Sequence, residues 1–94
     1  MKIVATNFRP MSKTTLRGFV DPTLPDIGIV LKETALHEKD GQQWLSPAGR
    51  SYTDKATGAT KWVTLVDFTS REAKTAFQSA GLAAVRKLVE EGGR

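Results

Sequence analysis

Four acidic side chains near the middle of the chain are the first candidates for chemistry: Asp26, Glu33, Glu38 and Asp40. Carboxylate oxygens are the hard ligands that Mg²⁺ prefers, so a metal-dependent nuclease could use such a set. The Glu-x-Lys spacing of a common nuclease core is missing, because the residue two positions after Glu33 is Ala35 and the one after Glu38 is Asp40. Glu38 and Asp40 also flank a turn, where charges are usually solvated. The pattern therefore favours surface acids, and a nuclease stays the minor alternative.

Motifs of other enzyme classes are absent from the sequence. It contains no GxxxxGK[ST] or GxGxxG phosphate loop, no GxSxG nucleophile elbow and no HExxH zinc motif. The only histidine, His37, falls in a predicted strand, where a lone histidine is more often structural than a ligand or a general base. No cysteine is available for a disulfide or a thiolate metal site. We therefore expect no enzymatic activity, no metal, no cofactor and no small-molecule substrate.

Basic and aromatic residues are interleaved in the segment after the middle of the chain. Arg50, Lys55 and Lys61 occur there, with Tyr52 between the first two and Trp62 directly after the last. Basic side chains can neutralise phosphates, and aromatic rings can stack on unpaired bases. This interpretation has Arg50, Lys55 and Lys61 contacting phosphate while Tyr52 or Trp62 stacks on a base.

A structural interpretation of the same segment competes with the functional one. Trp44 and Trp62 can pair across two strands and fill the core, while the lysines keep a hairpin soluble and protect a sheet edge. For the two tryptophans the sequence favours the core. For Arg50 and its neighbours both interpretations stay open.

The overall composition permits an anionic partner without requiring one. The 94 residues carry 14 Lys and Arg against 10 Asp and Glu, a net charge of +4. This length predicts one domain, residues 1–94, with a small core that homodimerisation would help to stabilise. The N-terminal residues lack the apolar stretch of a secretory signal, and no apolar run approaches the roughly 20 residues that span a bilayer. We therefore expect a soluble, cytoplasmic protein without a membrane segment.

The first two-thirds of the chain alternate apolar and polar residues with a period of two, which predicts β-strands. Proline, glycine and aspartate mark the turns and the strand ends between them. The predicted strands are Ile3–Arg9 (ended by Pro10), Thr15–Asp21, one strand from Ile27 that continues through a kink or bulge to Glu38, Gln43–Ser46 (ended or limited to an edge by Pro47) and Lys61–Phe68. The predicted turns are Asp21-Pro22, Leu24-Pro25-Asp26, Asp40-Gly41 and Thr57-Gly58.

The last third changes to the period near 3.6 that is typical of a helix, predicted at residues 70–91. The hydroxyl of Thr69 and the carboxylate of Glu72, three residues later, fit a capping box. Gly92-Gly93 supply the stop. Gly81 costs about 1 kcal/mol relative to alanine inside a helix, so it either marks a close approach to the sheet or a partner helix, or is simply tolerated. The predicted apolar stripe contains Ala73, Phe77, Ala80, Leu82, Ala84, Val85, Leu88 and Val89.

This order of elements predicts the α+β class. We expect an antiparallel sheet of four to five strands within residues 2–68, followed by one long C-terminal helix packed on one face. A single helix covers only one face of such a sheet. The other face is then polar, or something else covers it.

Parts of the chain resemble the SpoVG septation-regulator family. The segment HEKDGQQWLSPAGRSY resembles the family's hairpin, apolar strand and Pro-small-small-Arg element, here Pro47 to Arg50. DFTSREAKTAFQSAGLAAVRK resembles its closing helix with an early arginine, Arg71, and TTLRGFVDPTL with IGIVLKETAL is compatible with its first two long strands. The resemblance implies a bacterial or phage relative that forms a homodimer with adjoining sheets and binds nucleic acid in a regulatory role, with Arg50 and Arg71 as candidate DNA contacts. The alanine-rich helix and the weakly basic segment after Pro47 depart from the family.

The order of strands and helix is also similar to that of the single-stranded-DNA-binding transcriptional coactivator family of the positive-cofactor type. GATKWVTLVDF and AVRKLV resemble the last strand and the helix of that family, whose dimers hold unpaired strands on a basic and aromatic sheet. Such a similarity of architecture does not settle function.

The leading hypothesis is a small dimeric regulatory protein that binds nucleic acid, DNA rather than RNA, with single-stranded DNA included. The alternative is a non-enzymatic protein-interaction module of phage or mobile-element origin. The candidate binding residues are Arg50, Tyr52, Lys55, Lys61, Trp62 and Arg71.

Overall fold

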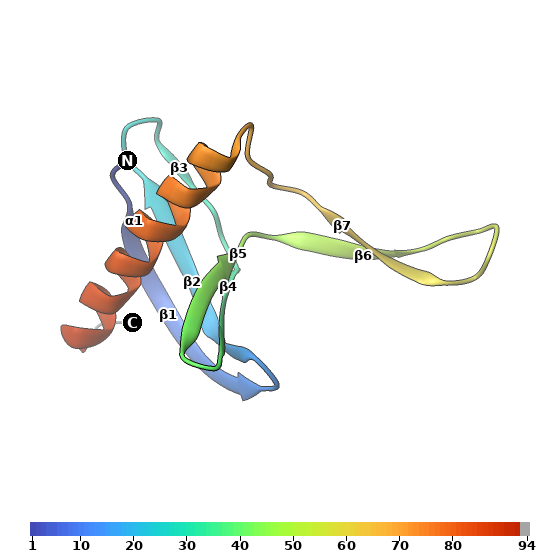
Figure 1. The fold of residues 1–94 in the computed structure, drawn as a ribbon, viewed down its shortest axis with the longest axis horizontal. Helices are drawn as coiled ribbons and strands as arrows, with labels where there is room; N and C mark the ends of the chain where they lie inside the picture. The colour runs from blue at the N-terminus through green and yellow to red at the C-terminus, as the bar shows by residue number, and fades with distance from the viewer. Residues whose placement is uncertain (93–94) are drawn as a thin grey trace.

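The computed structural model describes residues 1–92 and shows a twisted sheet, one helix across it and a long hairpin that extends away from both (Figure 1). The elements are β1 (Val4–Lys13), β2 (Leu16–Leu24), β3 (Ile29–Val30), β4 (Thr34–Lys39), β5 (Gln42–Ser46), β6 (Gly49–Thr53), β7 (Thr60–Thr64) and α1 (Arg71–Glu90). The main sheet is antiparallel with the order β1-β2-β4-β5, and β3 pairs with one end of β2. β6 and β7 form a separate two-stranded sheet. The predicted α+β class is confirmed.

Helix α1 begins one residue later than a capping box at Thr69 requires. The N-cap is Ser70, whose Oγ accepts a hydrogen bond of 3.1 Å from the amide of Ala73. Glu72 therefore lies in the first turn, where its charge complements the helix dipole. Gly92 follows the helix with a φ of +69°, as a stop signal should, and Gly93 lies outside the described residues. Within the described part of the chain, no helix is both long and apolar enough to cross a membrane.

The core lies between α1 and one face of the main sheet. Phe77, Gly81 and Val85 are the buried residues of the helix. A Cβ atom on residue 81 would stand 2.6 Å from Cδ1 of Leu45, so the glycine allows the helix to approach β5 closely. The first of the two interpretations of Gly81 is confirmed. The buried residues on the sheet side are Ala5, Val20, Leu36 and Leu45.

A helix side chain covers part of the free edge of the sheet. The amide of Leu45 donates to Oε1 of Gln78 at 2.8 Å, and Nε2 of Gln78 donates back to the Leu45 carbonyl at 2.7 Å. β5 is the last strand of the sheet, so these backbone groups have no strand partner on that side. Gln78 thus satisfies them and blocks pairing with another chain there.

Two prolines lie inside strands that they were predicted to end. β1 continues through Pro10 to Lys13, because β1 is an edge strand with irregular pairing on either side of Pro10. β2 continues through Pro22, so the predicted Asp21-Pro22 turn is wrong. Pro22 lies between the part of β2 that pairs with β4 and the part that pairs with β3. Neither pairing needs an N–H from this residue, so the proline costs the sheet no hydrogen bond.

Two predicted turns in the main sheet are confirmed, and one predicted strand is divided. Leu24-Pro25-Asp26 forms a turn in which the amides of Ile27 and Gly28 donate to the Leu24 carbonyl at 3.2 and 2.9 Å. Asp40-Gly41 has φ values of +53° and +79°, as a type I′ hairpin requires. The strand predicted from Ile27 to Glu38 is divided into β3 and β4 at Glu33, whose φ is +59°.

A polar network around Asp21 holds the start of β4 against β1. The Asp21 carboxylate accepts hydrogen bonds from Nη2 of Arg9, Nδ2 of Asn7 and the amide of Glu33, at 3.1, 3.1 and 3.0 Å. Asn7 and Glu33 both have positive φ values, which asparagine adopts readily but which are uncommon and strained for glutamate. Burial raises the pKa of Asp21, but the hydrogen bonds from Arg9, the Glu33 amide and Asn7 outweigh it and lower the pKa to about 2.

This network predicts a loss of stability in acid. The folded pKa of Asp21 lies below its ordinary value of 3.8, so the ionised carboxylate stabilises the fold above about pH 4, and this contribution disappears as the pH falls towards 2. The contribution is at most about 2 kcal/mol, because solvent screens the partly exposed Arg9. Urea denaturation at a series of pH values should show a shallower pH dependence between pH 5 and 2.5 for Asp21→Asn than for the wild type. Equal slopes for the two proteins would contradict the prediction.

Candidate nucleic-acid interface

The segment with the predicted binding residues forms a projecting hairpin, which we call the arm and define as residues 49–64 (Figure 1). By backbone proximity, β6 and β7 have only each other as neighbours among the strands and the helix of residues 1–92. Pro47 ends β5 as predicted, and the chain then leaves the main sheet. The Thr57-Gly58 tip is confirmed: Gly58 has a φ of +72°, and the Asp54 amide donates to the Ala59 carbonyl at 2.9 Å.

One face of the arm brings together three of the six candidate residues. Arg50 pairs with Val63 and Tyr52 pairs with Lys61, and because side chains alternate along a strand, all four lie on the same face. Arg50, Tyr52 and Lys61 are exposed. They form a strip of two cations and one phenol ring on a surface that solvent reaches.

One of these cations, Lys61, forms an ion pair with Asp54 of the arm. Nζ of Lys61 lies 2.9 Å from Oδ2 of Asp54. The hydrogen bond from Lys61 is the main cause that lowers the pKa of Asp54, and the Ala56 amide adds to it. Both side chains are at least partly open to solvent, so the pair is weak. Lys61 is thus less available to an outside anion than Arg50.

The other three candidate residues lie elsewhere. Lys55 is exposed in the tip of the arm, beyond β6. Trp62 pairs with Ser51 and therefore lies on the opposite face from Arg50 and Tyr52. Arg71 is the first residue of α1, outside the arm. The structure thus divides the predicted site among four places. Three belong to the arm: its basic face, its basic tip and the opposite face with Trp62. The fourth, Arg71, belongs to the main sheet and α1, which we call the body.

The prediction that Trp44 and Trp62 pair and fill the core is wrong. Trp44 is 37% exposed and Trp62 is 67% exposed. Trp44 pairs with His37 on the sheet face away from the helix, and their rings stack at 5.3 Å with an angle of 13° between the planes. Trp62 lies in the arm, where none of the elements within residues 1–92 forms a second layer that would bury it. His37 also contacts Thr15, with 2.9 Å between Nδ1 and Oγ1.

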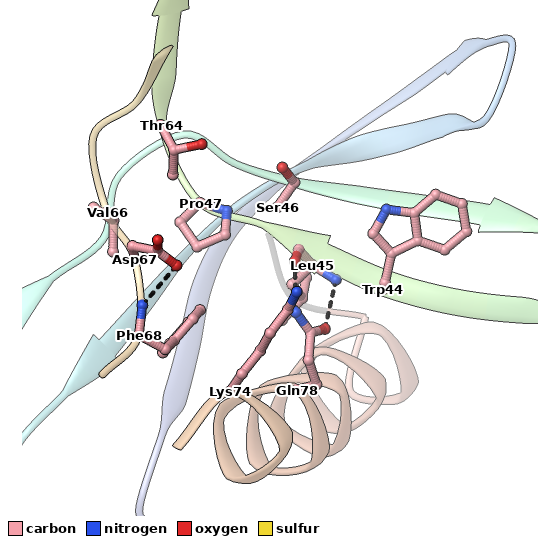
Figure 2. A pocket seen from close by; sticks show the side chains of 10 residues that line it. All are labelled: Trp44, Leu45, Ser46, Pro47, Thr64, Val66, Asp67, Phe68, Lys74 and Gln78. Carbon is pink, nitrogen blue, oxygen red and sulfur yellow. Dashed lines mark hydrogen bonds between the residues drawn. The ribbon is translucent and has the colours of Figure 1, made fainter. Parts of the chain in front are cut away.

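Two hollows flank the point where the arm leaves the body. The first, of about 470 Å³, lies on the helix side. Figure 2 shows Lys74 and Gln78 entering it from α1, with Asp67 and Phe68 opposite on the segment that leads into the helix. The second, of about 480 Å³, lies between Trp62 and the sheet face that the helix does not cover.

The second hollow includes residues that sequence reasoning missed. Leu16, Phe19 and His37 line it. An irregularity in the pairing of β2 with β4 lies between Leu16 and Gly18, and it places Leu16 opposite His37 and on the same face as Phe19. Strict alternation puts Leu16 and Phe19 on opposite faces, so the sequence pattern gave no signal for this surface.

The acidic residues do not converge. Glu33 accepts a hydrogen bond from Nη2 of Arg9 at 2.8 Å, and Glu38 accepts one from Nε2 of Gln43 at 2.9 Å. Across residues 1–92, no three acidic or histidine side chains are placed together so that they could hold a metal ion. The convergence of Asp26, Glu33 and Glu38 that a nuclease would need is therefore not present.

Comparisons with known proteins do not identify a relative. No protein-family model, no curated protein and no solved structure matches this chain. The resemblances to the SpoVG and coactivator families stay hypotheses, and the functional argument depends on the geometry of the arm.

Proposed function

We propose that this protein binds nucleic acid through the arm, DNA rather than RNA, as a homodimer in a regulatory role. The observation that supports this most directly is the exposed strip of Arg50, Tyr52 and Lys61 on a hairpin that projects from the body, with Lys55 at its tip. The arm carries these three cations against a single carboxylate, Asp54. It thus concentrates positive charge on the part of the molecule that reaches furthest into solvent.

The shape of the arm suits this role. The DNA major groove admits a two-stranded β-ribbon, and the arm is such a ribbon without a layer of structure on either face for most of its length. Cations on a projecting hairpin reach phosphates without desolvating the body of the protein. Phosphate contacts release counterions, so binding by this surface must weaken as salt increases.

The first test is the removal of the two unpaired arm cations. Arg50→Ala combined with Lys55→Ala should weaken binding to a labelled oligonucleotide about tenfold or more at 100 mM salt. It should also reduce the slope of log K against log salt by about two, because each duplex phosphate contact contributes about 0.9 to that slope. Fluorescence anisotropy titrations at several salt concentrations measure both quantities.

The matched control removes the same charge from the body. Arg86→Ala combined with Lys87→Ala changes two exposed cations near the C-terminal end of α1, and it should alter the slope far less. Asp54→Asn should act in the opposite direction and strengthen binding about two- to fivefold, because it frees Lys61. Asparagine keeps an acceptor for the Ala56 amide, which donates to Asp54 at 2.8 Å. Wild-type binding that is absent, or that ignores salt, would contradict the proposal.

A protein-interaction module is the second candidate, because apolar side chains are exposed beside β3. Ile27, Ile29 and Val30 are neighbours in sequence and all exposed, and such patches are typical of protein interfaces. The same patch is a candidate contact for the homodimer. The interaction-module hypothesis predicts no salt-sensitive binding of oligonucleotides, so the titrations above discriminate between the two functions.

A further inference from the structure

The hollow between the arm and the open sheet face, which we call the aromatic groove, has walls of a distinctive kind. Trp62 forms the wall on the arm, and Leu16, Phe19, Ala35 and His37 form the wall on the sheet. The helix lies on the other side of the sheet, so within residues 1–92 no other element covers this face (Figure 1). The groove is therefore open to a ligand and lined largely by rings and apolar side chains.

The backbone of the arm holds Trp62 in place. A Cβ atom on residue 49 would stand 2.6–2.7 Å from Cζ2, Cε2 and Nε1 of the indole ring. Only glycine at position 49 leaves space for the ring to lie against the strand in this way. The ring nevertheless remains 67% exposed. The Trp62 ring is thus already held in one position. A ligand that stacks on it does not have to restrict the motion of this side chain, which would lower the affinity.

The wall of the groove on the sheet is also held in place by neighbouring side chains, and its one charged residue has a partner of opposite charge. His37 is held by its stack on Trp44, and Phe19 pairs with Ala35 on the same face of the sheet. The one charged residue in the lining, Glu33, lies 2.8 Å from the Arg9 guanidinium, which offsets its charge. The groove suits flat, uncharged rings, and the cations that could hold phosphates lie on the arm outside it.

We propose that the aromatic groove binds the bases of an unpaired stretch of nucleic acid, with Trp62 as the stacking platform. This proposal depends on the proposed function and specifies its substrate class. In a duplex the faces of the bases are hidden by their neighbours, whereas an unpaired strand exposes them for stacking on aromatic side chains. The net charge of +4 and the arm cations complement the backbone of such a strand.

The test compares a 12-nucleotide oligo(dT) with a duplex hairpin of similar charge. Trp62→Leu should weaken binding of oligo(dT) about tenfold, the effect of losing one stacked base, and leave duplex binding within about twofold. Trp62→Phe, which keeps a ring, should restore much of the loss. Gly49→Ala, which retains Trp62 but displaces its ring, should act like Trp62→Leu. Thermal unfolding followed by circular dichroism checks that each variant remains folded.

A spectroscopic readout localises the contact. The chain has two tryptophans, so Trp44→Phe leaves Trp62 as the only one, and oligo(dT) should quench its fluorescence. One outcome would contradict the role of the groove and leave the proposed function intact. In it, duplex binding persists, neither Trp62→Leu nor Gly49→Ala weakens the binding of oligo(dT), and oligo(dT) does not quench the fluorescence of Trp62. Equal losses for both oligonucleotides would also contradict that role. If neither oligonucleotide binds, both proposals fail.

Discussion

Replacing Phe77 with alanine is expected to lower the free energy of unfolding by about 3–5 kcal/mol, the usual cost of truncating a large buried aromatic residue. Phe77 is 1% exposed, and its ring lies 5.1 Å from that of Phe68. It belongs to the core cluster that α1 shares with the sheet. A small domain has roughly 5–15 kcal/mol of stability in total, so this loss should leave a large unfolded population in mild denaturant. Urea denaturation followed by circular dichroism measures it.

The control for Phe77 lies on the same helix. Val89 is 49% exposed, and Val89→Ala should cost less than about 1 kcal/mol because little apolar surface is lost from a buried site. Both residues lie on α1, but Phe77 is buried in the helix and Val89 is exposed near its end. Similar costs for both would mean that the helix does not pack on the sheet through the face described above.

Much of the helix could be predicted from the sequence, because its determinants are local. A hydroxyl cap, a 3.6-residue apolar period and a closing glycine lie within one continuous segment. The error of one residue at the cap arose because Thr69 and Ser70 both carry a suitable hydroxyl. Only the structure shows that Ser70 takes the capping position.

The strands were less predictable because their limits depend on distant partners. Pro10 is tolerated because β1 lies at an edge, and Pro22 because β2 changes partner at that point. Neither fact can be read from the residues near the proline. The Asp40-Gly41 turn, by contrast, was correctly predicted, since the positive φ values that it needs are a local property.

The tryptophans show the same limit at the candidate site. A large ring in a strand pattern predicts a core residue only if a second layer covers that strand. Trp62 lies in an arm with no such layer, and Trp44 lies on the face opposite the helix. Of the six predicted binding residues, Arg50, Tyr52 and Lys61 share a face because they belong to one hairpin. The position of Arg71 relative to them depends on the whole fold.

Deleting the arm is expected to abolish nucleic-acid binding while the body remains folded. The deletion joins Ala48 to Leu65 through two glycines, and a short link suffices because the Leu65 amide donates to the Ala48 carbonyl at 3.2 Å. Since β6 and β7 have no other strand or helix as a neighbour in the part of the chain that the structure describes, the melting temperature should change by only a few degrees. Affinity for any oligonucleotide should fall about a hundredfold or more, because three cations are removed together, and the loss for an unpaired strand should be larger still because the stacking ring of Trp62 goes with them.

The deletion also separates the two parts of the predicted site. Arg71 remains in the shortened protein, at the first position of α1. Residual salt-dependent binding that disappears with Arg71→Ala would place the nucleic-acid contact on the body and contradict the role proposed for the arm. Loss of the cooperative unfolding transition would instead show that the arm is part of the folding unit. Complete loss of binding with an intact transition is the result expected if the arm is the contact surface and the rest of the chain folds without it.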